Sequence, residues 1–171
     1  MGKNRPLRMF GALAGVALLG LFLVPSQGFG QTTHTIFMTA LEVKGGTSAD
    51  KLAPPTVNPK DLSKGYELKP PGEADKRDPK RWEVSSYIFS PGFVTVRQGD
   101  KVDLTIFVVN GDAHESWITD PEGRKVLANT MFNRGREYKV SFTAEKVGAY
   151  QLTCSEHAPT MAATFLALPR K

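Results

Sequence analysis

Short β-strand patterns separated by turns fill most of the second half of this chain of 171 residues. In residues 101–109, Val102, Leu104, Ile106 and Val108 alternate with more polar positions, which is typical of a strand with one buried face. Similar patterns cover residues 83–89, 93–97, 114–119, 138–143, 148–154 and 162–168. Strands at this regular spacing predict an all-β sandwich or barrel, and no long helix is expected.

Residues 154–161 hold the only cysteine of the chain and one of its three histidines. Cys154, His157 and Met161 place a thiolate, an imidazole and a thioether on one tight loop, and His114 lies upstream beside a predicted strand end. Such soft donors favour copper over calcium, magnesium or manganese, which prefer oxygen ligands. Two histidines, a cysteine and a weak axial methionine predict a mononuclear electron-transfer copper site.

The first thirty residues have the pattern of a secretory signal peptide. Lys3, Arg5 and Arg8 precede an apolar run of about fifteen residues, which is shorter than the ~20 that a membrane-spanning helix needs. We therefore expect cleavage near Gly30 and an exported, periplasmic protein, and the alternative is an uncleaved N-terminal membrane anchor. In an exported chain a single cysteine is a reactive liability, which burial or ligation by a metal would remove.

Charge argues against nucleic acid as a partner. The whole chain has a formal net charge of +5, but its first thirty residues contain three basic and no acidic side chains. Without them, 19 basic and 17 acidic residues remain, a net charge of +2. The basic balance therefore comes largely from the predicted leader.

The remaining chain is predicted to form one domain of residues 82–171, preceded by a different kind of segment at 31–81. Residues 35–43 contain enough β-formers for one strand, which we expect at an edge of the sandwich. Residues 44–81 are rich in proline and lysine and poor in large apolar groups, which predicts an extended arm around the outside. His34 is expected in a mobile tail.

Three segments in the correct order resemble the cupredoxins, the blue-copper fold of plastocyanin and pseudoazurin. Residues 148–157 match the family's Gly-x-Tyr strand that ends in Cys-x-x-His, residues 107–114 match its first-histidine strand, and residues 90–100 match its opening segment. The resemblance covers about residues 82–169. It implies a cupredoxin-like Greek-key β-sandwich with type 1 copper.

The resemblance and the donor chemistry together imply a role for each residue. Cys154 would bind as thiolate, His114 and His157 would complete a trigonal plane, and Met161 would be the weak axial donor. Asn110 would hold the surrounding loops through hydrogen bonds of its side chain. The loop departs slightly from its relatives, because three residues separate His157 from Met161.

The axial position therefore has two competitors, Glu115 and Glu156. A carboxylate donor would shift the site towards a red, catalytic copper that resembles nitrosocyanin. The chain is also similar to the periplasmic domain of cytochrome c oxidase subunit II around His114 and Cys154. That family's dinuclear centre needs a second cysteine, and Ala158 occupies its place, so one copper is the maximum.

The predicted function is an exported type 1 copper protein that carries single electrons and is not an enzyme. Its partners would be redox proteins such as a c-type cytochrome, an oxidase or a reductase. The alternatives are a copper carrier or metallochaperone and the red-copper catalyst. Trp117 and Phe132 could form an apolar rim for a partner beside His157, although ordinary core is the commoner place for either residue.

Overall fold

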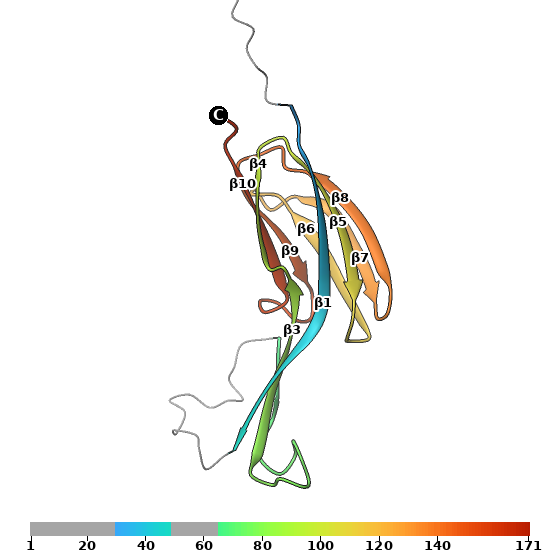
Figure 1. Cartoon of the computed structure of the whole chain (residues 1–171), viewed down its shortest axis with the longest axis vertical. Helices are drawn as coiled ribbons and strands as arrows, with labels where there is room; N and C mark the ends of the chain where they lie inside the picture. The colour runs from blue at the N-terminus through green and yellow to red at the C-terminus, as the bar shows by residue number, and fades with distance from the viewer. Residues whose placement is uncertain (1–29, 49–64) are drawn as a thin grey trace, which may run out of the picture.

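The computed structural model describes residues 30–48 and 65–171, and every helix or strand in those ranges is a β-strand. Two five-stranded sheets pack face to face (Figure 1), with the orders β2-β3-β1-β5-β8 and β4-β10-β9-β6-β7. The strands are β1 (Thr33–Ser48), β2 (Tyr66–Lys69), β3 (Arg81–Ser90), β4 (Phe93–Arg97), β5 (Lys101–Val108), β6 (Ala113–Thr119), β7 (Lys125–Asn133), β8 (Glu137–Thr143), β9 (Gly148–Cys154) and β10 (Ala162–Leu168). The predicted all-β class is confirmed.

The leader prediction concerns residues 1–30, of which only Gly30 belongs to the described residues. Part of the predicted arm, residues 49–64, also lies outside them. Within the described ranges no helix is long and apolar enough to cross a membrane.

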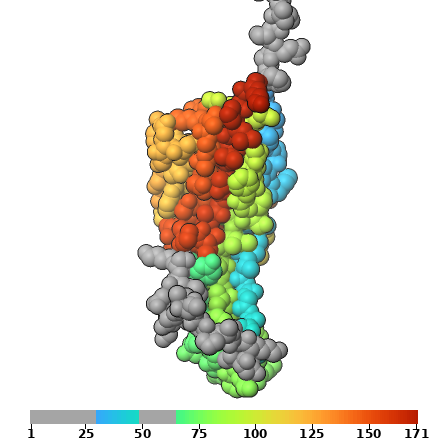
Figure 2. Space-filling model, turned by 90° about the vertical axis from the view of Figure 1, so that its left-hand side faces the viewer, coloured from blue at the N-terminus to red at the C-terminus, as the bar shows by residue number. Residues whose placement is uncertain are grey.

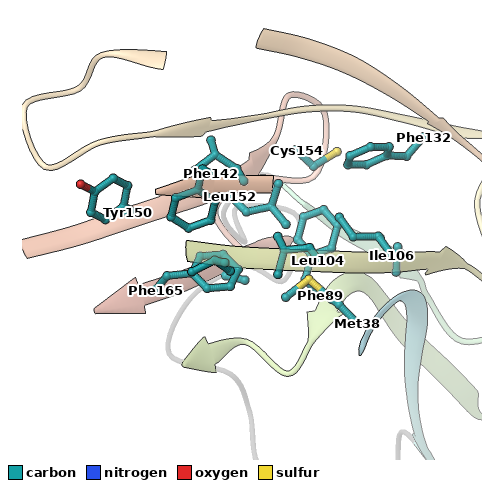
Figure 3. Packing of buried hydrophobic residues seen from close by; sticks show 14 of the residues in the cluster. Met38, Phe89, Leu104, Ile106, Phe132, Phe142, Tyr150, Leu152, Cys154 and Phe165 are labelled. Carbon is teal, nitrogen blue, oxygen red and sulfur yellow. The ribbon is translucent and has the colours of Figure 1, made fainter. Parts of the chain in front are cut away.

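The core lies between the two sheets, because the inward positions of their strands are apolar. In β5 the alternating residues Val102, Leu104, Ile106 and Val108 are all buried. Figure 3 shows residues of this cluster, with Cys154 beside Phe132 and its sulfur directed towards the Phe132 ring. Each large apolar side chain that is fully buried contributes roughly 1.5–3 kcal/mol to the free energy of unfolding.

Strand β1 lies inside its sheet, so the prediction of an edge strand is wrong. It pairs in parallel with β5, from Thr33 opposite Lys101 onwards, and antiparallel with β3, up to Ser48 opposite Arg81. Its side chains Met38 and Ala40 belong to the buried core. The short apolar pattern at 35–43 indicated a strand, but it carried no information on which neighbours would pair with it.

Beyond the sandwich, β1 and β3 continue together as a twisted ribbon to which β2 adds a third strand (Figure 1). We call residues 41–48, 66–69 and 81–88 the ribbon. Figure 2 shows it projecting from one end of the elongated molecule. Residues 44–48 and 66–69 therefore form strands, whereas the composition had predicted an extended arm.

The ribbon is amphipathic, which explains how so few apolar residues can form it. Cross-strand partners share a face of a sheet, and the registers place one apolar set on one face. That set is Leu41, Val43, Tyr66, Leu68, Val84 and Ile88. Glu42, Glu67 and Glu83 occupy the opposite face, so one side of the ribbon is polar and can remain in water.

Strand β7 was not predicted from the sequence. It is an edge strand paired only with β6, and most of its nine residues are exposed. Only Phe132 is buried. A strand that is solvated on both faces lacks the alternation on which a pattern-based prediction depends.

The buried carboxylate of Asp100 binds residues from both ends of the described chain, at the end of the sandwich opposite the ribbon. The oxygens of Asp100 accept hydrogen bonds from the main chain of Thr32 and Arg97 and from His34 Nε2 at 2.8 Å, and Arg170 forms an ion pair with it. His34 thus lies in β1 with a defined partner, and its expected place in a mobile tail is wrong. Burial acts to raise the pKa of Asp100, but these hydrogen bonds and the Arg170 charge outweigh it and hold that pKa far below its ordinary value.

We expect Asp100→Asn to lower the free energy of unfolding by about 2–3 kcal/mol near neutral pH, because it removes charge-assisted hydrogen bonds from a buried group. Because the pKa of Asp100 is lowered in the folded protein, its ionised carboxylate stabilises the fold at pH values above 3.8, the ordinary carboxyl pKa. This stabilisation is lost as the pH falls below that value. The difference in free energy of unfolding between wild type and Asp100→Asn should therefore become smaller at acid pH. Urea unfolding at several pH values measures this difference. Asp103→Asn is the control, since Asp103 is more exposed and, among the described residues, forms its ion pair with Lys101. An equal loss in both variants would contradict this role of Asp100.

Candidate metal centre

Strand register brings two of the predicted ligands to the same end of the core. Strands β6 and β9 are antiparallel neighbours, with Ser116 opposite Cys154. His114 and Ser116 both face the core from β6, and Cys154 is the last core-facing residue of β9. His114 therefore extends just past the end of β9, beside the thiol.

His157 returns to the same point from the loop that follows β9. The ligand atoms of His114, Cys154 and His157 lie within 4.8 Å of one another. The Sγ of Cys154 is 3.9 Å from His114 Nδ1 and 3.6 Å from His157 Nδ1. Both imidazoles thus direct the same ring nitrogen towards the thiol. His114 and Cys154 are fully buried, and His157 is half-buried.

The far side of the His114 ring is fixed by the turn before β6. His114 Nε2 lies 2.9 Å from the carbonyl oxygen of Asn110. Because a carbonyl oxygen only accepts, Nε2 must carry the proton, which leaves the lone pair of Nδ1 directed at the site. Gly111 makes this approach possible: its φ is +79°, and a Cβ there would lie 2.4 Å from His114 Nε2.

Hydrogen bonds close the loop of residues 154–161. The Cys154 amide donates to Met161 O at 3.1 Å, and the Met161 amide donates to His157 O at 2.8 Å. Thr160 Oγ1 also donates to His157 O, at 2.8 Å, and lies 3.2 Å from the carbonyl oxygen of Gly65 at the start of the ribbon. Met161 is fully buried and joined through its main chain to both of the other loop ligands.

Comparisons with known proteins add evidence on the fold. No protein-family model matches the sequence, and no curated protein matches it significantly. A copper nitrite reductase from Nitrosomonas europaea has a similar structure, with a TM-score of 0.50, 15% identity, and coverage of 82% of this chain and 43% of that one. The fold is cupredoxin-like.

Two further solved structures are similar at lower scores. A multi-copper oxidase from Pseudomonas thermotolerans has a TM-score of 0.49 and 10% identity over 83% of this chain and 31% of that one. Auracyanin A, a blue copper protein from Chloroflexus aurantiacus, has a TM-score of 0.39 and 18% identity over 47% of this chain and 89% of that one. The chain spans less than half the length of the oxidase and the reductase. The finer resemblance to plastocyanin, pseudoazurin and oxidase subunit II stays a prediction.

In this cluster the thiol of Cys154 and the imidazole of His114 shift each other's pKa values. Burial acts to raise the pKa of Cys154, but the hydrogen-bonding contact with His114 and the main-chain amides of the loop outweigh it and lower that pKa. Burial acts to lower the pKa of His114, and its contacts with Cys154 and Asn110 outweigh it and raise that pKa. Burial, and next the electrostatic effect of His114, lower the pKa of His157.

The two carboxylates that could replace Met161 do not join the cluster. Glu115 lies on the opposite face of β6, where its Oε1 accepts a hydrogen bond from Asn129 at 3.0 Å. Glu156 is exposed on the loop. In the described part of the chain, the only group of three or more His, Cys, Asp or Glu side chains close enough to share an ion is His114, Cys154 and His157.

Asn110 holds the site at two points. Its side-chain oxygen accepts a hydrogen bond from the main chain of Glu42 in β1 at 3.3 Å, and its carbonyl binds His114 as described above. Phe132 is fully buried in the core, the commoner place expected for it, and does not form an apolar rim. Trp117 lies on the outer face of its sheet, with Lys125 Nζ 4.9 Å from its ring centre.

Tyr87 was not predicted as part of the site, although its ring contacts both histidines. Its ring centre is 4.4 Å from that of His157 and 5.0 Å from that of His114. Tyr87 belongs to β3, for which the sequence predicted a strand over residues 83–89 and no role at the site. The signal available was alternation: Ser86 and Ile88 share one face, so Tyr87 must face the other way.

Proposed function

We propose that this protein binds one copper ion through His114, Cys154 and His157 and carries single electrons between exported redox partners. The observation that carries the proposal is the convergence of the three donors, with both Nδ1 atoms directed at one thiol. A thiolate with two imidazoles is a soft donor set that suits copper, and in a trigonal arrangement it is the set of blue-copper sites. Copper bound there would supply a one-electron Cu(I)/Cu(II) couple.

The surroundings of the donors support a carrier rather than an enzyme. Two of the three donors are fully buried in a sandwich core, and only His157 reaches the surface. Such a site leaves a substrate little access to the ion, whereas an electron needs only a short path through one exposed ligand edge. The donors also come from β6, from β9 and from a hydrogen-bonded loop, so their positions should change little with the charge of the ion.

The nature of the partner is a further part of the proposal. A c-type cytochrome, an oxidase or a reductase would fit a carrier of this kind, in the periplasmic location that the leader pattern predicts. A solved structure with a similar fold is a copper nitrite reductase, which is consistent with copper redox chemistry.

Adding Cu(II) to the purified protein tests the proposal. We expect an intense visible absorption from thiolate-to-copper charge transfer, and an electron paramagnetic resonance (EPR) spectrum of one type 1 species. A folded protein that gives no such absorption would contradict the proposal. A copper carrier should instead lose Cu(I) readily to a soluble chelator, whereas an electron carrier should retain it through repeated redox cycles.

Met161 is the predicted axial donor, and its substitution should change the reduction potential more than the colour. Met161→Leu removes a weak donor that favours Cu(II), so the reduction potential should rise. The rise is on the order of 60 mV for each tenfold change in the affinity of the site for Cu(I) relative to Cu(II). Met161→Gln provides a stronger oxygen donor and should lower it. Potentiometric titration of both variants measures the shifts. Met38→Leu, in the core but not in the loop, is the matched control. Unchanged potentials in both Met161 variants would show that the thioether does not contact the ion.

A further inference from the structure

Three rings form a compact group at the centre. Tyr87 packs against His157 and His114 with interplanar angles of 46° and 56°, and the two imidazoles lie 5.2 Å apart, edge to face. Centres 4.4–5.2 Å apart place the three rings at ordinary aromatic contact distances. Among the described residues, Tyr87 is the one tyrosine, phenylalanine or tryptophan whose ring contacts both histidines.

The two histidines differ in what else holds them. His114 has the Asn110 carbonyl behind its ring, at a turn that only glycine can form without a clash. In the described part of the chain, the His157 ring has no hydrogen-bonding contact except that with Cys154 Sγ. The hydrogen bond from Thr160 reaches only its main-chain oxygen. Besides that contact, the His157 ring packs against the rings of Tyr87 and His114, and the Tyr87 ring is the nearer of the two.

Tyr87 is itself held firmly by strand pairing. It lies opposite Glu42 of β1, and the Glu42 amide donates to the side chain of Asn110, the residue that fixes His114. A Cβ at Gly111 would lie 3.1 Å from the Tyr87 ring, so the turn and the ring are in close contact. The ribbon, the turn at Gly111 and the three rings are thus connected by direct contacts.

We propose that Tyr87 is a positioning residue that fixes both imidazole rings, and that of His157 above all, with Nδ1 towards Cys154 before any metal binds. The inference rests on the proposed metal site and adds a residue to it. Preset donors lose less freedom when an ion arrives and release it more slowly. Side chains that orient metal ligands typically change metal affinity 10–100-fold when they are removed.

The experiment compares Tyr87→Leu and Tyr87→Phe with wild type. Tyr87→Leu should release copper to a chelator roughly 10–100-fold faster and give an EPR spectrum of more than one species. Tyr87→Phe retains the ring and should restore the wild-type rate and spectrum. Tyr66→Leu is the matched control, because Tyr66 is an exposed tyrosine of the same ribbon without a ring contact to either histidine. Wild-type release and a single wild-type spectrum for Tyr87→Leu would overturn the inference.

The metal-free protein provides a second readout that does not depend on copper. Nitrogen-detected NMR of the imidazoles should show one His157 tautomer in wild type and in Tyr87→Phe, and averaged signals in Tyr87→Leu. If wild type does not bind copper but the His157 signals still average in Tyr87→Leu, the proposed function fails and the positioning role stands. If Tyr87→Leu does not fold, Tyr87→Ile replaces it, because isoleucine suits a strand better. Faster copper release and averaged His157 signals in Tyr87→Ile would then support the inference, and wild-type release and signals would overturn it.

Discussion

Cys154→Ser should abolish the intense visible absorption of the copper-loaded protein completely. The colour of such a site arises from charge transfer between thiolate sulfur and copper, and Cys154 is the only cysteine in the chain. The remaining imidazoles could still hold Cu(II), so the EPR spectrum should change to that of an ordinary type 2 site rather than disappear. Absorption and EPR spectra of the same sample measure both effects.

Stability of the variant needs a separate check, because the thiol is fully buried. A hydroxyl left without a partner there would cost about 1–3 kcal/mol. Cys154→Ala avoids that cost and should lose the absorption equally, so it is the matched control. If either variant kept an intense visible band, the thiolate would not be its source and the proposed site would be wrong.

A version of the protein that begins at Trp82 should fail to fold, whereas one that begins at Gly30 should fold like the full chain. The shorter version lacks β1, which lies between β3 and β5. It would expose the main-chain groups of both neighbours along a long edge and remove Met38 and Ala40 from the core. Loss of one large core side chain alone typically costs 2–5 kcal/mol, out of a total stability of roughly 5–15 kcal/mol.

Circular dichroism during heating and the dispersion of amide NMR signals measure this effect. The version that begins at Trp82 should show no cooperative transition. A cooperative transition at the temperature of the full chain would contradict the central role of β1. An intermediate result, with folding but a greatly lowered transition, would show that β5 can close the sheet onto β3 without β1.

The sequence was most informative where residues alternate cleanly or carry unusual chemistry. The pattern of β5 and the strands from 148 to 168 predicted both the elements and their buried faces, because one face of each strand packs in the core. The pairing of Cys154 with His157 followed from spacing on one loop. His114 was added from the donor set and from the resemblance of residues 107–114 to the first-histidine strand of the cupredoxins. The register of Ser116 opposite Cys154 gives the physical reason for its position.

The failures have physical causes as well. Composition underestimated the ribbon, because a strand with one solvated face needs only a few apolar residues such as Val43 and Leu68. Nothing local in β1 indicates two neighbours rather than one. The partners of His34 and Tyr87 depend on long-range pairing: Asp100 and the two histidines lie far away along the chain.

The place of β1 also determines the order in which the molecule can fold. Thr33 pairs with Lys101, and the ribbon end of the strand pairs with residues up to Arg81. β1 is thus synthesised first among the described strands, and its two partners follow only at residues 81–90 and 101–108. Closing such long loops carries an entropic cost before any contact offsets it, and it slows folding. We therefore expect this chain to fold more slowly than a sandwich in which every strand pairs with its neighbour in sequence.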